Sequence, residues 1–324
     1  MPRLIRFPAV ARPVRPRRSG FTITELMIAV SLFGLVMASL MGLLVRQQRF
    51  YRGANEIIDT RTQLRQAAGV LPADLRSISS IGNDIKFISD TMIEFLATYG
   101  TTIVCAKNST VEFIAPSDTL TRHTLTAWLS MPRAGDTVFV YDEGTRTGSE
   151  DDNWFRARLA SVATATAGCE AFNNPNGADN ARVRYRFTLN SLTPMPATVV
   201  NGATVRFARP ARYRFYRGSD NLWYLGYQQY TVSGLMGAWS STQPLAGPYD
   251  PYASTGSTSN GLRFLFYNQA GTQVTTTTAA AMASIARVDV AMKARGPSAN
   301  NTALSRGGQL RDSLLIRIAI RNRS

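Results

Sequence analysis

The stretch that decides the fold of this chain begins Gly20-Phe21-Thr22-Ile23-Thr24-Glu25 and continues through residues 26–45, which carry no charge. These 20 uncharged residues are enough to cross the hydrocarbon core of a bilayer as one α-helix. The residues before Gly20 contain six basic side chains and no acidic one: Arg3, Arg6, Arg12, Arg15, Arg17 and Arg18. The chain therefore opens with a basic leader, a glycine, a lone carboxylate and an apolar helix, in that order.

This order resembles the processing and assembly segment of the type IV pilin family, which includes the pseudopilins of type II secretion. The resemblance implies that prepilin peptidase cuts after Gly20 and methylates the new amine of Phe21. An ordinary secretory signal loses its apolar stretch on cleavage, whereas here the helix stays attached. By the positive-inside rule the leader stays cytoplasmic, and the later domain lies outside the inner membrane. The leader is long for the family, and a start at Val10 or Val14 would give the same product.

Glu25 requires a partner, because an ionised carboxylate in a membrane helix costs about 2.5 to 3.5 kcal/mol on insertion scales. Cleavage would place the amine of Phe21 one helical turn away, on the same molecule or on a neighbour. In the family, the matching glutamate is thought to pair with the N-terminal amine of an adjacent subunit, which implies the same role for Glu25. The alternative is an ordinary signal anchor with an incidental glutamate.

Two glycines interrupt the apolar stretch, Gly34 and Gly42. Each weakens a helix by about 1 kcal/mol relative to alanine. They match small or helix-breaking positions of the family, which implies close helix packing or local melting in a filament. Ordinary glycine use in a membrane helix is the alternative.

Beyond residue 45 the apolar side chains recur at spacings of three and four, which is typical of one face of a helix. They are Phe50, Ala54, Ile57, Ile58, Leu64, Ala68, Leu71, Leu75 and Ile78. We therefore predict one helix from about Thr22 to Leu71, with a kink at Pro72. Its first half belongs in lipid or among like helices, and its second half lies against a globular domain.

The remainder of the chain alternates in short apolar and polar runs, which predicts an antiparallel, β-rich domain and an α+β fold. The predicted strands are 92–96, 111–114, 137–141, 155–159, 182–187, 213–216, 261–267, 272–278, 287–293 and 315–320. In 182–187 we expect the arginines Arg182, Arg184 and Arg186 to face outward, and in the last strand Ile316, Ile318 and Ile320 to face inward. Residues 237–260 and 296–308 are predicted loops. The predicted organisation is a removed leader 1–20, a membrane and assembly half 21–45, an amphipathic half 46–71 and a β-rich domain 72–324.

The order of elements also resembles the larger, PilW-like minor pilins. The motifs that carry this resemblance are weak singly: Gly135-Asp136-Thr137-Val138 with Trp154, Leu222-Trp223-Tyr224, Gly261-Leu262-Arg263-Phe264 and Ile320-Arg321-Asn322. The resemblance implies a minor pilin that assembles into, primes or tips a type IV pilus used in adhesion or twitching motility. Its partners would be other pilins, prepilin peptidase, the inner membrane and the pilus assembly platform. The alternatives are a J-like pseudopilin of type II secretion and a signal-anchored envelope adhesin or receptor that never polymerises.

The composition is that of a globular protein, with 44% hydrophobic and 18% charged residues. Without the leader arginines, 30 basic residues face 21 acidic ones, a net charge of about +9. Cys105 and Cys169 are the only cysteines, and an oxidising compartment favours their pairing over two free thiols. On the chain-entropy model such a bridge stabilises by about 4 kcal/mol.

Enzyme functions and cofactors find little support in the sequence. His123 is the only histidine and has no nucleophile motif beside it, and the chain has no P-loop and no GxGxxG motif. One acidic cluster consists of Asp142, Glu143, Glu150, Asp151 and Asp152. Its spacing lacks the EF-hand pattern, which favours a solvated turn over a calcium site.

A run of arginines interleaved with aromatic residues is the remaining functional candidate. It contains Arg206, Arg209, Arg212, Arg214 and Arg217 with Phe207, Tyr213, Phe215 and Tyr216. Cations with aromatic rings are typical of nucleic-acid surfaces, but strands also carry arginine on ordinary solvated faces. We expect Arg212, Arg214 and Arg217 to contact other pilins in preference to DNA.

Overall fold

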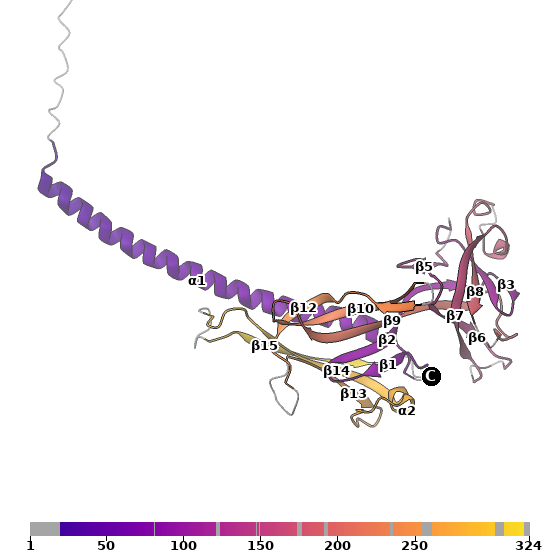
Figure 1. The fold of residues 1–324 in the computed structure, drawn as a ribbon. Coiled ribbons are helices and arrows are strands. Elements are labelled where there is room, and N and C mark those ends of the chain that lie inside the picture. The colour runs from indigo at the N-terminus through magenta and orange to yellow at the C-terminus, as the bar shows by residue number, and fades with distance from the viewer. Residues whose placement is uncertain are drawn as a thin grey trace, which may run out of the picture.

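The computed structural model describes residues 20–80, 82–120, 124–146, 148, 150–173, 177–190, 194–233, 236–253, 261–301 and 308–320. The leader before Gly20, His123 and Arg321 lie outside the described residues. A single long helix, α1 (Ile23–Arg76), leads into a β-rich domain (Figure 1). This arrangement confirms the predicted α+β fold.

The helix α1 has 54 residues, which gives it a length of about 81 Å at 1.5 Å per residue. Thr22 caps its N-terminus, and Ser77 caps its C-terminus by donating its backbone N–H to the carbonyl of Asp74. Pro72 lies inside the helix, which continues to Arg76, so the predicted end at Leu71 was wrong by five residues. Burial of Leu71, Leu75 and the following Ile78 in the domain explains why the helix outlasts its proline.

Among the described residues, 15 strands form one sheet. They are β1 (Ile85–Ile88), β2 (Met92–Ile103), β3 (Ala106–Ser109), β4 (Glu112–Ala115), β5 (Ala127–Trp128), β6 (Thr137–Asp142), β7 (Asn153–Ala165), β8 (Arg184–Asn190), β9 (Thr204–Arg217), β10 (Trp223–Ser233), β11 (Met236–Trp239), β12 (Gln243–Tyr249), β13 (Leu262–Asn268), β14 (Ile285–Arg295) and β15 (Arg311–Ala319). The main path runs β13-β14-β12-β10-β9-β6-β7-β8-β4-β3, with β15 beside β14 and β2 beside β9. Every strand pair among the described residues is antiparallel. Two short helices complete the fold, η1 (Glu170–Phe172) and α2 (Ala279–Ala283).

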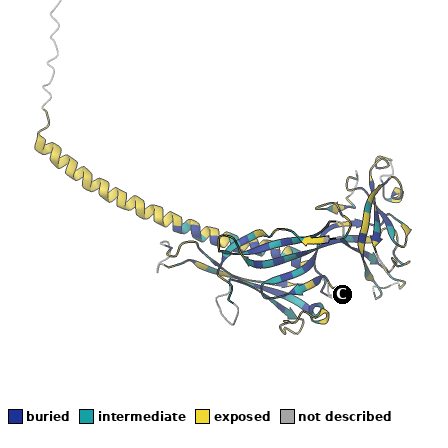
Figure 2. Ribbon diagram, in the orientation of Figure 1, coloured by how far each residue is buried: buried dark blue, intermediate teal, exposed yellow. Residues whose placement is uncertain are grey.

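The domain has a proximal half next to α1 and a distal half at the far end (Figure 1). The proximal half consists of the packed part of α1 with β1 and β10 to β15, and its core includes Leu71, Tyr213 and Phe264. The distal half consists of β3 to β8, and its core includes Phe113, Phe187 and Phe207. The strands β2 and β9 run through both halves, paired from Met92↔Arg214 to Ile103↔Thr204. These two strands therefore join two separately packed cores (Figure 2).

Several sequence-based strand predictions require correction. The predicted loop 237–260 contains most of β11 and all of β12, which pair with β10. The predicted strand 272–278 is not a strand: the segment makes one isolated bridge, Tyr267↔Gln273. In the last strand the prediction holds, because Ile318 and Ile320 are buried and Arg317 is exposed.

The predicted row of arginines around β8 was wrong for Arg184 but not for Arg182 and Arg186, which are exposed. Arg182 lies in a turn before the strand, where its N–H donates to the carbonyl of Asp179. Arg184 is buried and donates to the carbonyls of Thr166 and Asn180, whereas Val183 is exposed. The turn carbonyls that Arg184 satisfies explain its burial, because a buried guanidinium requires hydrogen-bond acceptors.

A disulfide joins Cys105 and Cys169, with their Cα atoms 4.9 Å apart. It links the residue before β3 to the residue before η1. Ile114 and Ala165 are buried around it, forming a small core of their own at the distal end. The bridge therefore fixes the loop after β7 to the outermost strands of the sheet.

Candidate functional site: the N-terminal helix and its junction with the domain

The first turn of α1 is closed by a capping box between Thr22 and Glu25. The Glu25 carboxylate accepts from the Thr22 backbone N–H at 3.0 Å and from the Thr22 hydroxyl at 2.9 Å. In return, the Glu25 N–H donates to the Thr22 hydroxyl oxygen at 3.3 Å. These bonds satisfy orphan groups of the helix N-terminus. Both bonds to the carboxylate use a single oxygen, Oε2, so Oε1 has no hydrogen-bond partner among the described residues.

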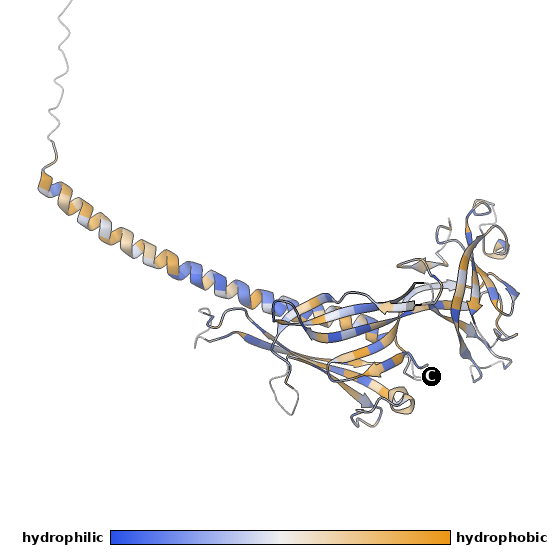
Figure 3. Cartoon of the chain, in the orientation of Figure 1, coloured by the Kyte–Doolittle hydropathy of each residue, from blue (hydrophilic) through white to orange (hydrophobic). Residues whose placement is uncertain are grey.

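The apolar half of α1 makes no side-chain contact with the domain and is exposed along its whole length (Figures 2 and 3). Phe33 and Leu35 are 62% and 69% exposed, although both are large apolar side chains. A Cβ added at Gly34 or Gly42 would meet no atom within 4 Å. Among the described residues, α1 is the one helix long and apolar enough to cross a membrane. This half therefore requires lipid or other helices to cover it.

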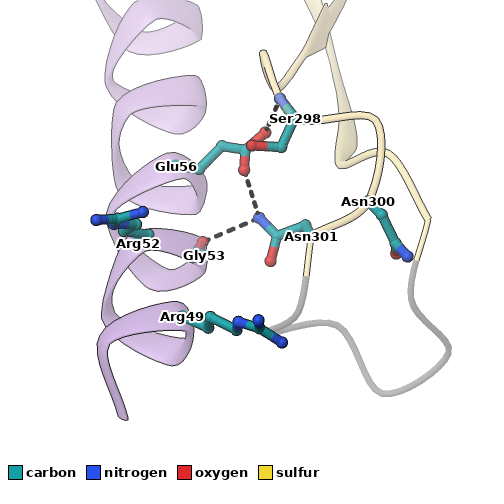
Figure 4. Close-up of a pocket in the computed structure, with 7 residues that line it drawn as sticks. All are labelled: Arg49, Arg52, Gly53, Glu56, Ser298, Asn300 and Asn301. Carbon is teal, nitrogen blue, oxygen red and sulfur yellow. Dashed lines mark hydrogen bonds between the residues drawn. The ribbon is translucent and has the colours of Figure 1, made fainter. Parts of the chain in front are cut away.

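The packed half of α1 begins at a polar junction with the loop after β14 (Figure 4). Glu56 is only 7% exposed. Its two carboxylate oxygens accept from the Ser298 N–H and from the Asn301 side-chain amide, each at 3.0 Å. The same amide donates to the Gly53 carbonyl at 3.0 Å. Both oxygens of Glu56 thus accept a hydrogen bond, so its burial leaves neither of them without a donor.

Close backbone approach at this junction depends on Gly296. A Cβ built on Gly296 would lie 1.9 Å from Oε1 of Glu56, which is far inside van der Waals contact. Beside the junction lies a cavity of about 290 Å³ that opens between the helix and the loop. The other residues that line it include Arg49, Arg52 and Asn300. The junction is therefore polar, and no large apolar side chain of the described residues lines the cavity.

Farther along, α1 changes to apolar packing. Leu64, Ala67, Leu71 and Leu75 are buried against the proximal sheet. In the last turns, the Tyr213 hydroxyl donates to the Asp74 carboxylate at 2.5 Å, which ties the helix end to β9. Burial raises the pKa of Tyr213, and the neighbouring Asp74 raises it further, so the hydroxyl keeps its proton.

The predicted inward face of the amphipathic half was correct only in its second part. Phe50 and Ile58 are 57% and 61% exposed, and the domain instead covers Gly53, Glu56 and Thr60. The loop after β14 covers this first part of the amphipathic half. It offers hydrogen-bond donors, so the polar side of the helix faces it. No local sequence signal indicates this contact, because Asn301 lies 245 positions from Glu56.

The predicted arginine surface is partly engaged inside the molecule. Arg212 is paired with Glu94 at 3.2 Å, donates to Gln228 at 2.7 Å and lies 4.1 Å above the Trp239 ring. Arg217 is exposed and donates to the Asn221 carbonyl. Arg214 is half-buried. These contacts occupy Arg212 in the folded monomer and weaken the case for a phosphate-binding role there.

Arg209, from the same run, belongs to a buried network between the two halves of the domain. It forms a two-pronged pair with Asp136 at 2.7 and 2.8 Å, and the Tyr99 hydroxyl donates to the same carboxylate at 2.6 Å. The guanidinium also donates to Ser130 and to the Met131 carbonyl and lies 4.1 Å above the Tyr99 ring. Removing one partner of such a buried pair typically costs 3 to 5 kcal/mol. Arg209 is therefore structural.

The acidic cluster forms hydrogen-bonded turns. Asp151 accepts from the N–H groups of Thr145 and Arg146, and Asp152 accepts from the Tyr141 hydroxyl. The two Thr145 and Arg146 contacts lower the pKa of Asp151, with Thr145 contributing the larger effect. Within the described part of the chain, no group of three or more His, Cys, Asp or Glu side chains is arranged to hold a metal ion.

Comparison with known families identifies the N-terminal segment. Residues 15–41 match the model of the prokaryotic N-terminal methylation motif, which covers the end of the leader, Glu25 and most of the apolar half of α1. The chain matches no curated protein and no solved structure. The matched motif, the capping box at Glu25 and the uncovered apolar half of α1 all lie in this one segment. The N-terminal segment is therefore that of a type IV pilin-like protein of the kind processed by prepilin peptidase.

Proposed function

We propose that this protein is a PilW-like minor pilin that assembles into, primes or tips a type IV pilus. The observation that supports this most is the division of α1. Its apolar half carries Glu25 at its start and has no partner within the molecule, whereas its other half is fixed to the domain. A helix that is apolar all round needs lipid before assembly and can exchange lipid for other helices afterwards.

The proposed sequence of events begins with insertion into the inner membrane, the leader in the cytoplasm and the domain in the periplasm. Prepilin peptidase then cuts between Gly20 and Phe21 and methylates the Phe21 amine. The Glu25 carboxylate pairs with the amine of a neighbouring subunit, for which its second oxygen is available. Gly34 and Gly42 permit close packing or local melting of α1 as the subunit leaves the membrane for the pilus or cell surface.

A J-like pseudopilin of type II secretion would use the same segment in the same way. The two proposals differ in their partners, which would be pilins in one case and pseudopilins in the other. Crosslinking from an introduced cysteine in the exposed apolar half, followed by mass spectrometry of the captured subunits, distinguishes them.

The test of assembly is the pair of variants Glu25→Val and Glu25→Asp. Valine removes a charge from the membrane segment, so insertion and cleavage should be unchanged or improved. We expect the amount of this protein in sheared filaments to fall at least about tenfold for Glu25→Val, since a lost charged hydrogen bond costs about 1.5 to 3 kcal/mol. Glu25→Asp keeps the charge and should retain part of the incorporation.

Two outcomes would contradict the proposal. Normal incorporation of Glu25→Val would show that the carboxylate is incidental. Absence of the wild-type protein from sheared filaments, with full presence in membranes, would identify a signal-anchored envelope protein that never polymerises.

A further inference from the structure

Three arginines share the outer face of the distal sheet, the face opposite the distal core, and one lysine of β1 in the proximal half lies near them. Arg156 on β7 and Arg206 on β9 both lie directly across from Phe139 on β6. Since directly paired residues share a sheet face, all three side chains lie on one side. Arg158 follows two positions after Arg156 and so shares that face, and Lys86 on β1 lies near enough to interact electrostatically with Arg156 and Arg158. We name Lys86, Arg156, Arg158 and Arg206 the cationic strip.

The members of the cationic strip have no hydrogen bond and no ion pair with any described residue. In this they differ from Arg209, Arg212 and Arg287, each of which is paired with a carboxylate. Asp84 is the carboxylate that interacts with the strip, but it is only 4% exposed and one of its oxygens accepts from the Ser79 N–H at 2.8 Å. The four positive charges of the cationic strip are therefore close to a single carboxylate, which is buried.

Aromatic rings contact two of the three guanidinium groups of the strip, those of Arg156 and Arg206. Arg156 and Arg206 lie 5.7 and 5.1 Å from the centroid of the Phe139 ring, and Arg206 lies 4.2 Å from that of Trp154. Such cation–π contacts leave the N–H edges of a guanidinium free to bind an anion. At the far end, the Tyr141 hydroxyl donates to Asp152, which bounds the strip on that side.

The strip is electrostatically unfavourable in the isolated protein. Burial lowers the pKa of Arg156 and of Arg206. Burial also lowers the pKa of Lys86, and repulsion from Arg156 lowers it further. Like charges held together on one face cost free energy that a bound anion would return. By contrast, Arg209, Arg212 and Arg287 are each neutralised by a carboxylate.

We propose that the cationic strip binds the phosphate backbone of nucleic acid without reading its sequence. Three of the four groups are arginine, which recognises phosphate through paired N–H donors. The strip crosses adjacent strands, so it presents cations along about 10 Å, two strand spacings of about 4.8 Å. A clustered basic face of this kind is the electrostatic footprint of nucleic-acid binding.

The position of the strip favours nucleic acid over the lipid of the inner membrane. The strands β6 and β7 lie at the end of the molecule farthest from the apolar half of α1 (Figure 1). The rings beneath the strip are engaged with guanidinium groups, so base stacking is not expected to contribute, and affinity should come from phosphate contacts. This function does not depend on whether the protein polymerises.

The test uses the full-length protein in a non-ionic detergent and a fluorescent, mixed-sequence single-stranded DNA, with binding measured by anisotropy. Four phosphate contacts predict a slope of about −2.8 for log K against log salt, so affinity should fall about 50-fold between 50 and 200 mM salt. In the triple variant Lys86→Ser, Arg156→Ser and Arg158→Ser, the slope should fall to about −0.7. Arg206 is kept in this variant because it packs on Phe139 and Trp154.

A control variant makes the same change in net charge in the proximal half: Arg214→Ser, Arg217→Ser and Arg311→Ser. We expect it to bind DNA within about twofold of wild type, because its arginines lie outside the strip. A second variant, Arg156→Lys with Arg158→Lys, keeps the charge and should keep the salt slope. Equal losses in both triple variants would overturn the proposal in favour of net charge alone. Unchanged binding in the strip variant, or displacement of DNA by an equal charge of polyglutamate, would also overturn it, the latter in favour of an acidic protein partner.

Discussion

The two halves of α1 belong to one continuous helix but have opposite relations to the rest of the molecule. In the apolar half, Leu35 is 69% exposed, and in the packed half Leu71 is fully buried. A leucine side chain thus has no packing partner within the described chain at position 35, whereas at position 71 it is packed on all sides. The first half is built to be covered by something outside this molecule, whereas the second fixes the helix to its domain. The difference separates what folds the subunit from what assembles it.

A matched pair of leucine truncations tests whether the two halves of α1 are energetically separate. Leu71→Ala removes buried apolar volume from the proximal core and should lower the free energy of unfolding by about 2 to 5 kcal/mol. Leu35→Ala should leave the unfolding of the domain unchanged, because the side chain touches no part of it. Denaturant unfolding in detergent, followed by tryptophan fluorescence, measures both. Equal effects would show that the halves are not energetically separate.

Glu56→Ala tests where the packed half begins. It removes the acceptor of the Ser298 N–H and one of the two acceptors of the Asn301 amide, and an unsatisfied buried group costs about 1 to 3 kcal/mol. Because Asn301 also donates to Gly53, protection from hydrogen exchange should fall most around the loop after β14. As a control, Asp59→Ala removes a neighbouring exposed carboxylate and should have little effect. Equal losses for both variants would contradict the assigned junction.

The smallest expected effect concerns the outer side of the packed half. Ile58→Ser should change the free energy of unfolding by less than about 0.5 kcal/mol, because the side chain is 61% exposed and faces away from the domain. A loss above about 2 kcal/mol in the same denaturant assay would place Ile58 in the core, as the helical periodicity suggested.

The parts of the fold that the sequence predicts are those fixed by local pattern. The apolar run after Glu25 predicts the long helix, and alternation around Ile316 and Ile318 predicts the last strand. A lone glutamate after a glycine-terminated basic leader likewise predicts the processing segment, which the family match bears out. In each case the signal lies within a few residues of the feature.

The parts that were missed depend on partners distant in sequence. Glu56 is buried because the loop after β14 offers it donors, and Arg209 is buried because Asp136 lies opposite it 73 positions away. The residues of the cationic strip likewise come from β1, β7 and β9, and only the order of strands in the sheet brings these strands together. Periodicity alone assigned Phe50 and Ile58 to the inward face, since an apolar side chain usually faces the core. It could not anticipate a polar covering loop.

We predict that the apolar half of α1 remains in the mature protein behind a new N-terminus at Phe21. Mass spectrometry of the N-terminal peptide, on protein purified from membranes of cells that contain prepilin peptidase, tests it most directly. We predict a first residue of Phe21 with a methylated amine, and an uncleaved precursor when Gly20 is replaced by a bulky residue. A mature N-terminus beyond residue 45, with α1 shortened to its packed half, would contradict the account.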